Sequence, residues 1–130
     1  MKFGYTIVYV SDVVAAIDFY GRAFGLSARF VHESGQYGEL ETGATTLAFA
    51  SHPWASSTVP GGYIRPDPSA LPFGIEIGLV TADVPAGVAK AVAAGATLVA
   101  EAKTKPWGQV VAYVRDPEGT LVELCTPMGG

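Results

Sequence analysis

Two glutamates inside otherwise apolar segments are the first candidates for chemistry. Glu76 lies in FGIEIGLVT, residues 73–81, and Glu123 lies in TLVELCT, residues 120–126. Desolvating a carboxylate costs free energy, so each needs a partner or solvent. If both face one cavity, desolvation and mutual repulsion should raise at least one pKa. The pair could bind a polar or cationic ligand. Alternatively, Glu123 bonds a hydroxyl such as that of Tyr5, or both carboxylates are solvated at an open edge.

Other reactive groups receive little support from the sequence. Cys125 has no histidine beside it, and a thiol in an apolar segment is usually inert. His32 and His52 could act as general bases, but nothing in the sequence places either near the acids. His52 begins a proline-rich stretch, so we expect it at the surface. Gly61 and Gly62 precede no helix, which argues against a phosphate-binding loop.

Composition limits the remaining classes of function. The 130 residues suit one ordinary domain, and 49% hydrophobic with 15% charged residues is typical of a folded protein. A net charge of −4 argues against nucleic-acid binding, which needs clustered Lys and Arg. The sequence has no apolar run long enough to span a membrane and no signal peptide. The single cysteine favours a reducing compartment, so we expect a cytoplasmic protein without membrane or nucleic-acid partners.

The first half of the chain predicts one helix among four strands. Residues 4–10 are β-branched and aromatic, which is typical of a strand. Asp12 is a suitable N-cap for a helix that carries an apolar stripe and ends at Gly25. Turn residues then separate three further strands, at 28–33, 36–42 and 45–50.

The second half repeats this order. A strand at 73–81 precedes Asp83, which caps a helix that ends at Gly95. Three strands follow, at 97–102, 108–114 and 120–126. An offset of 70 to 71 residues superposes the caps and stops, which indicates an internal repeat. We therefore predict an α+β fold made of two tandem βαβββ modules.

Residues 51–72 connect the two modules and contain five prolines together with Trp54 and Tyr63. An irregular connection of this length is unusual unless it is functional or disordered. It could be a stiff spacer that covers exposed core, or its aromatic side chains could line a pocket. We predict a single domain, 1–130, with module one at about 1–50, this linker, and module two at about 73–130.

Two segments resemble the signature stretches of a known superfamily. VSDVVAAIDFYGRAFGL, residues 10–26, and YVRDPEGTLVEL, residues 113–124, are similar to those of the vicinal oxygen chelate superfamily. This group contains glyoxalase I, extradiol dioxygenases, fosfomycin-inactivating enzymes and bleomycin-resistance proteins. The resemblance implies paired βαβββ modules that form a U-shaped open barrel, usually as a homodimer. It does not define an activity, because the fold serves enzymes and pure binders alike.

The resemblance also implies four metal-ligand positions, two on the first strands and two on the last. In this sequence they are occupied by Tyr5, Ala48, Glu76 and Glu123. A divalent cation needs at least three protein ligands. Ala48 cannot coordinate a metal through its side chain, and the Tyr5 phenol stays protonated near neutral pH. We therefore expect no cofactor, and a divalent metal on Glu76 and Glu123 remains the alternative.

Aromatic residues supply candidate ligand contacts. Trp107, in KTKPWGQV, resembles the Trp-Gly segment of drug-binding members of the superfamily, whose aromatic ring flanks the ligand. Its indole could stack on a planar ring, or it could cover the edge of the barrel. Trp54, Tyr63, Phe30 and Tyr37 are further candidates, with core or dimer-interface roles as the alternative. Together they would form an aromatic cleft above acidic groups, suited to a flat, partly cationic molecule.

The resulting hypothesis is a non-catalytic protein that binds or sequesters a hydrophobic or aromatic small molecule, similar to the antibiotic-sequestering members. Each homodimer would hold two molecules, with specificity from Trp107, the linker aromatics, Glu76 and Glu123. A first alternative is a glyoxalase- or dioxygenase-type enzyme that uses the two glutamates and a third ligand. A second is a metal-free isomerase or epimerase in which a pocket glutamate acts as general base.

Overall fold

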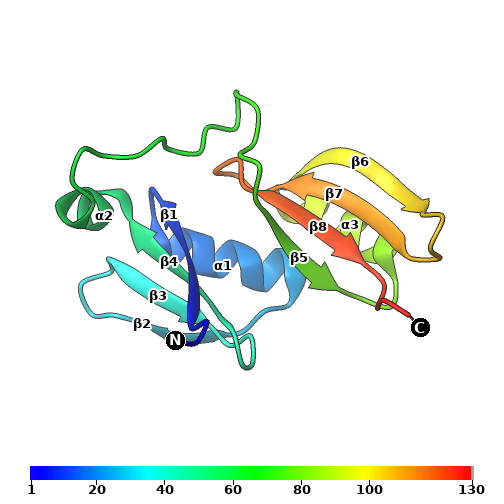
Figure 1. Ribbon diagram of the computed structural model, residues 1–130, viewed down its shortest axis with the longest axis horizontal. Coiled ribbons are helices and arrows are strands. Elements are labelled where there is room, and N and C mark those ends of the chain that lie inside the picture. The colour runs from blue at the N-terminus through cyan, green and yellow to red at the C-terminus, as the bar shows by residue number, and fades with distance from the viewer. Residues whose placement is uncertain (130) are drawn as a thin grey trace. The chain divides into compact units, whose positions relative to one another are not determined.

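Each half of the chain folds into one four-stranded sheet. The computed structural model describes residues 1–129, and it contains two compact units, Met1–Arg65 and Pro66–Gly130 (Figure 1). The first unit contains β1 (Tyr5–Val10), α1 (Val13–Phe24), β2 (Ala28–Val31), β3 (Tyr37–Leu40), β4 (Thr46–Ser51) and α2 (His52–Thr58). The second contains β5 (Glu76–Val80), α3 (Val84–Ala94), β6 (Thr97–Thr104), β7 (Val110–Arg115) and β8 (Leu121–Cys125). The predicted α+β class and the βαβββ order of both modules are confirmed.

The two sheets share one topology. Their strand orders are β1-β4-β3-β2 and β5-β8-β7-β6, and in each the first strand runs parallel to the last. Tyr5 lies opposite Thr46 in the first unit, and Glu76 lies opposite Leu121 in the second. The outer strands β2 and β6 are both irregular next to their neighbours, β2 between residues 28 and 30 and β6 first between residues 98 and 100. The repeat therefore extends to strand register.

The helices begin and end where the sequence predicts. Asp12 accepts a hydrogen bond from the backbone nitrogen of Ala15 at 3.0 Å, and Asp83 accepts one from Ala86 at 3.1 Å. These carboxylates satisfy amide groups that have no partner within the first turn. Gly25 ends α1 with φ 71°, a left-handed conformation that other residues rarely adopt.

In each unit one helix covers one face of the sheet. The Tyr20 ring on α1 packs 5.0 Å, centroid to centroid, from the Phe49 ring on β4. A β-carbon added to Gly87 of α3 would lie 3.3 Å from the Leu124 side chain on β8, so α3 packs against that side of its sheet. Because successive strand residues point to opposite faces, the neighbours of Phe49 and Leu124 lie on the other side. We call this side the open face of each sheet.

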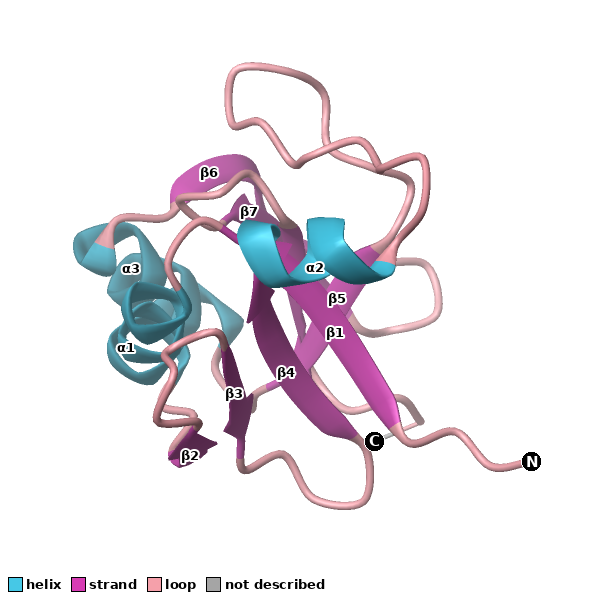
Figure 2. Ribbon diagram, turned by 90° about the vertical axis from the view of Figure 1, so that its left-hand side faces the viewer, coloured by secondary structure: helices cyan, strands magenta, loops and turns pink. Residues whose placement is uncertain are grey.

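The expectation of an irregular connection at residues 51–72 was wrong for its first part. Residues 52–58 form α2, which contacts β4 and β1 (Figure 2). Ser51 caps it by accepting a hydrogen bond from the Trp54 nitrogen at 3.2 Å, and Pro53 occupies the first turn, where a missing N–H costs nothing. His52, expected at the surface, is only 3% exposed because α2 folds back against the sheet. No helix within residues 1–129 has the length and apolar character to cross a membrane.

The two helix caps provide a test of the repeat. Asp12→Ala and Asp83→Ala should each lower the free energy of unfolding by about 1 kcal/mol, because each leaves a first-turn amide without its acceptor. Urea denaturation monitored by circular dichroism measures both losses. The control is Asp18→Ala, which removes an exposed ion pair with Arg22 and should cost at most about 0.5 kcal/mol. Equal losses in all three variants would contradict the capping role.

Candidate functional site

The predicted site residues divide between the two units. Tyr5, Phe30, Tyr37, Ala48, Trp54 and Tyr63 belong to the first unit, and Glu76, Trp107 and Glu123 belong to the second. Each group forms a distinct chemical arrangement within its own unit. The first is dominated by aromatic rings, and the second by two carboxyl groups and a tryptophan beside a cleft.

Three aromatic rings lie in a row on the first unit. The Tyr37 ring centroid is 6.0 Å from that of Phe30 on β2 and 6.4 Å from that of Trp54 on α2. Phe30 is 45% exposed and Trp54 is 41% exposed, so both rings present apolar surface to solvent. Tyr37 lies opposite Ala50, and Ala48 lies opposite Glu39, which places these side chains on the open face. We call Phe30, Tyr37 and Trp54 the aromatic row.

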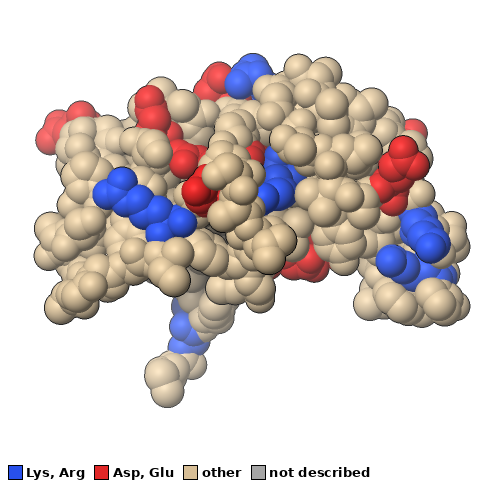
Figure 3. All heavy atoms as spheres, turned by 90° about the horizontal axis from the view of Figure 1, so that it is seen from above, with Lys and Arg blue, Asp and Glu red and all other residues tan. Residues whose placement is uncertain are grey.

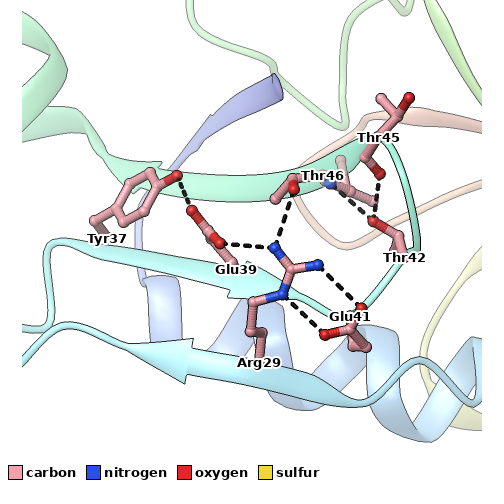
Figure 4. A network of polar contacts seen from close by, with 8 residues as sticks. Arg29, Tyr37, Glu39, Glu41, Thr42, Thr45 and Thr46 are labelled. Carbon is pink, nitrogen blue, oxygen red and sulfur yellow. Dashed lines mark hydrogen bonds and ion pairs between the residues drawn. The ribbon is translucent and has the colours of Figure 1, made fainter. Parts of the chain in front are cut away.

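A polar network fixes the middle of the aromatic row (Figure 4). The Tyr37 hydroxyl donates to Glu39 Oε2 at 2.7 Å, and Arg29 Nη1 donates to Glu39 Oε1 at 3.2 Å and to Thr46 Oγ1 at 3.1 Å. Arg29 also donates through Nε and Nη2 to the two carboxylate oxygens of Glu41, at 2.9 and 3.0 Å. This two-point contact matches the planar geometry of guanidinium and carboxylate. Glu39 is 8% exposed, so the network holds a nearly buried charge.

The network shifts the pKa values of Tyr37 and Glu41 in opposite directions. Burial raises the pKa of Tyr37 well above its ordinary value, and the neighbouring Glu39 raises it further. The Arg29 guanidinium lowers the pKa of Glu41 through hydrogen bonds and charge. Near neutral pH the phenol is therefore protonated, and Glu41 carries a full charge. Tyr37 therefore donates a hydrogen bond to Glu39 and keeps its proton, so its ring stays neutral.

Sequence reasoning missed Arg29, Glu39 and Glu41. The local signal was present: the hairpin that joins β2 to β3 brings residue 29 beside residues 39 and 41 once the strands are aligned antiparallel. The irregularity between residues 28 and 30 was not predictable. It allows the side chains of Arg29 and Phe30, which are consecutive in the sequence, to lie on the same face of the sheet.

The second unit brings two carboxyl groups together on its open face. Glu123 Oε1 accepts a hydrogen bond from the Tyr113 hydroxyl at 3.0 Å, so the hydroxyl that Glu123 binds is supplied by β7. Glu123 Oε2 lies 3.9 Å from the position that a β-carbon on Gly78 would occupy. Burial raises the pKa of Glu76 above its ordinary 4.5, and the charge and hydrogen bonding of Glu123 add to the rise. The direction for Glu76 agrees with the pKa increase expected of at least one member of the pair.

Neighbouring groups on this face stay protonated. Burial, followed by the influence of Glu123, raises the pKa of both Tyr113 and Cys125. A thiol is nucleophilic only as thiolate, so Cys125 is poorly suited to attack a substrate. The Cys125 Sγ lies 3.8 Å from the Leu79 carbonyl oxygen, to which it can donate weakly.

The donor set fits a divalent metal poorly. In the described part of the chain no group of three or more His, Cys, Asp or Glu side chains is arranged to hold an ion. Glu76 and Glu123 would be two ligands, while the adjacent phenol and thiol have raised pKa values and resist deprotonation. In the first unit Ala48 offers no ligand, and the carboxylate opposite it, Glu39, is already bound to Arg29.

Trp107 lies beside a cleft of about 430 Å³ in the second unit. Its indole Nε1 donates to Gln109 Oε1 at 2.8 Å, and Gln109 Nε2 donates to the Thr126 carbonyl at 2.8 Å. The indole is thereby tethered, yet Trp107 remains 61% exposed. The other lining residues are Gly108, Gln109, Thr126, Pro127 and Gly129.

The remaining candidates have structural partners. Tyr63 packs on Tyr9 with 4.8 Å between ring centroids, and its hydroxyl lies 2.6 Å from His52 Nδ1. His32 Nδ1 lies 2.8 Å from the Ser34 hydroxyl within the turn between β2 and β3.

On the face shown in Figure 3, Lys and Arg occur in small groups separated by uncharged and acidic surface.

The chain is an α+β protein built from two βαβββ modules, each with a helix on one face of its sheet. The chain belongs to the Glyoxalase/Bleomycin resistance protein/Dioxygenase superfamily, whose family model matches residues 2–124. This confirms the resemblance found in the two signature segments. No curated protein matches the sequence significantly.

Solved structures share the fold at low sequence identity. A glyoxalase-related enzyme from Fulvimarina pelagi is 22% identical with a TM-score of 0.81, covering 98% of this chain and 88% of that one. A glyoxalase/bleomycin resistance protein/dioxygenase family enzyme from Burkholderia phytofirmans PsJN is 24% identical with a TM-score of 0.77, covering 94% and 95%. TioX from Micromonospora sp. ML1 is 22% identical with a TM-score of 0.70, covering 97% and 98%. At these identities the likeness establishes the fold alone.

The Arg29 network leads to a prediction about stability. Arg29→Met should destabilise the protein more than Arg22→Met, because it leaves the nearly buried Glu39 without its cation, whereas Arg22 pairs with an exposed aspartate. Adding Glu39→Gln to Arg29→Met should recover part of the loss by removing the unpaired charge. Chemical denaturation of the single and double variants gives the coupling. Strict additivity would contradict the network.

The carboxyl pair leads to a prediction about pH. A raised pKa in the folded state favours the protonated form, so the favourable contribution of Glu76 is complete below its unfolded pKa and is lost as pH rises through its folded pKa. Glu76→Gln should therefore melt higher than wild type at pH 7, and the difference should vanish below about pH 4. Thermal melts across this range measure the effect.

The control for the pH experiment is Glu101→Gln, which neutralises an exposed carboxyl on β6 of the same unit. An equal gain in this variant would assign the effect to the protein's net negative charge instead of the Glu76–Glu123 pair.

Proposed function

We propose that this protein binds a hydrophobic, planar small molecule through stacking and does not transform it. The observation that carries the proposal is the aromatic row, in which Tyr37 lies between two rings that are each more than 40% exposed. Exposed aromatic surface supported by a rigid framework is characteristic of sites for flat organic ligands. Neither a metal nor another cofactor is required.

The supporting network makes the aromatic row suited to binding. Tyr37 is held by Glu39, which is held in turn by Arg29, so its ring is fixed before a ligand arrives. A pre-arranged ring loses little conformational entropy on binding. These features favour a broad, planar ligand.

The second unit offers contacts of a different kind. Trp107 presents a tethered indole at its cleft, and Glu76 and Glu123 present carboxyl groups. A planar ring could stack on Trp107, and a basic group could pair with Glu76 or Glu123 within this unit. We propose this ligand class, and a homodimer with two binding sites as the working form.

Fluorescence titration tests the proposal directly. The sequence contains two tryptophans, so Trp107→Phe leaves Trp54 as the single reporter on the aromatic row. Titration with proflavine, a planar cation, should quench Trp54 emission saturably. Trp54→Ala, followed by calorimetry, should weaken binding by about tenfold, which corresponds to 1.4 kcal/mol. The planar anion 9-anthracenecarboxylate shows whether charge contributes.

A matched control separates stacking from general hydrophobic adhesion. Leu71→Ser removes an apolar side chain that is 91% exposed and lies outside the aromatic row, so it should leave proflavine affinity unchanged. Equal loss in Leu71→Ser and Trp54→Ala would show nonspecific adsorption. Absence of saturable quenching by either planar probe would overturn the proposal.

A metal-free general-base enzyme is the second candidate, and the raised pKa of Glu76 favours it. A carboxyl group whose pKa lies closer to neutrality transfers protons more effectively at physiological pH. The two functions are distinguished by following bound compounds by NMR. Exchange of a substrate C–H proton with solvent, abolished in Glu76→Gln while binding persists, would favour the enzyme.

A further inference from the structure

Residues 59–75 connect α2 to β5 and cross the boundary between the two units, at Arg65 and Pro66. Such a connection, rich in proline and glycine, could be a long flexible tether. The contacts within each unit indicate otherwise, because both ends of the segment are held by specific side chains.

The first end is held on the first unit by Tyr63. Its ring packs on Tyr9 of β1 and stacks on His52 of α2, with centroids 4.8 and 5.7 Å apart. The hydrogen bond between the Tyr63 hydroxyl and His52 Nδ1, 2.6 Å long, adds a directional contact to this packing. The chain is therefore fixed to the first unit as far as residue 63.

The second end is held on the second unit by Arg115, the last residue of β7. Its Nη1 donates to the carbonyl oxygens of Ala70 at 2.6 Å and Pro68 at 3.3 Å, and its Nη2 donates to that of Asp67 at 3.0 Å. Its Nε donates to the Gly119 carbonyl at 2.9 Å, which orients the guanidinium. One side chain thus binds three carbonyl groups of the connecting backbone and one of the β7–β8 turn together.

The bound segment has a defined shape of its own. Asp67 Oδ1 accepts from the Ser69 nitrogen at 2.9 Å and from the Ser69 hydroxyl at 2.7 Å, and the Ala70 nitrogen donates to the Asp67 carbonyl at 3.0 Å. This turn orients the carbonyl groups that accept hydrogen bonds from Arg115. Serine hydrogen bonding lowers the pKa of Asp67, so its acceptor charge persists well into acid.

The β7–β8 turn is shaped to accept this segment. Gly119 has φ +98°, and a β-carbon there would lie 2.8 Å from the Pro68 nitrogen and 2.9 Å from the Asp67 carbonyl carbon. A side chain at 119 is therefore excluded by the connecting backbone as well as by its own conformation. Asp116 Oδ1 stabilises the turn by accepting from the nitrogens of Glu118 and Thr120, at 3.0 and 2.9 Å.

We propose that Arg115 is a clamp that fastens residues 67–70 to the second unit, so that residues 64–66 are the part of the connection between Tyr63 and the clamp that neither side chain holds. Three residues span at most about 11 Å, whereas the segment released by loss of the clamp would run from residue 64 to residue 75. The clamp thereby converts a long unattached connection into a short one. This inference is independent of the proposed ligand.

Backbone NMR relaxation tests the clamp on the intact 13.5 kDa chain. In wild type the {¹H}–¹⁵N NOE should be low at Ile64 and Arg65 and as high at Ser69 and Ala70 as in β7. In Arg115→Ala the low values should extend through Leu71, and amide exchange at Ser69 and Ala70 should accelerate at least tenfold. Low NOE values at Ser69 and Ala70 in wild type would overturn the proposal.

Two further variants keep the test decisive if Arg115→Ala disturbs folding. Arg115→Lys retains the charge but lacks the planar guanidinium that reaches four carbonyls, and Gly119→Ala places a β-carbon against both the segment and Arg115 Nη2. Both should mobilise residues 67–70 while β7 and β8 keep their chemical shifts. Arg22→Ala, which removes an exposed arginine from α1, is the control and should leave the segment rigid. Unchanged NOE values in both Arg115→Lys and Gly119→Ala would refute the clamp.

Discussion

The parallel pairing of the first and last strand in each unit determines the rest of the structure. Parallel neighbours need a crossover connection, and here the crossover carries the helix, so α1 and α3 each cover one face of their sheet. The opposite face is covered by neither α1 nor α3 and carries polar and aromatic side chains, with Trp54 of α2 beside it in the first unit. Glu39, Tyr37 and Trp54 in one unit, and Glu76 and Glu123 in the other, depend on this asymmetry.

The two units stabilise a carboxylate on the open face in different ways. In the second unit Glu123 lies on β8 and bonds Tyr113 on β7. In the first unit the corresponding position on the last strand is Ala48, and the carboxylate has moved to β3, where Glu39 bonds both Tyr37 and Arg29. A cation neutralises one acid, whereas the other remains beside a second carboxyl group. The same fold therefore offers one aromatic surface whose acids are paired with an arginine and one surface with two adjacent carboxyl groups.

The repeat and the helix limits could be predicted from sequence because they depend on local signals, such as Asp12 and Asp83 as caps and Gly25 as a stop. The short helix α2 was missed because its prolines and serines indicated a loop more strongly than its N-cap indicated a helix. The wrong expectation that His52 is exposed followed from that error. Arg29 and Arg115 were missed for a different reason. Arg29 bonds residues 10 to 17 positions away, which only the hairpin alignment of β2 and β3 indicates, and Arg115 bonds residues 45 to 48 positions away, for which a single sequence contains no signal.

The placement of the strand irregularities has a consequence for how each sheet meets other chains. Interruptions in the ladder occur along β2 and β6, the outer strands, whereas β1 and β5 pair with their neighbours in unbroken register. An uneven edge is a poor template for an incoming strand, and β6 adds charge through Glu101 and Lys103. Each sheet is thus protected against aggregation at one border. Its other border keeps the regular backbone spacing that selective strand pairing requires.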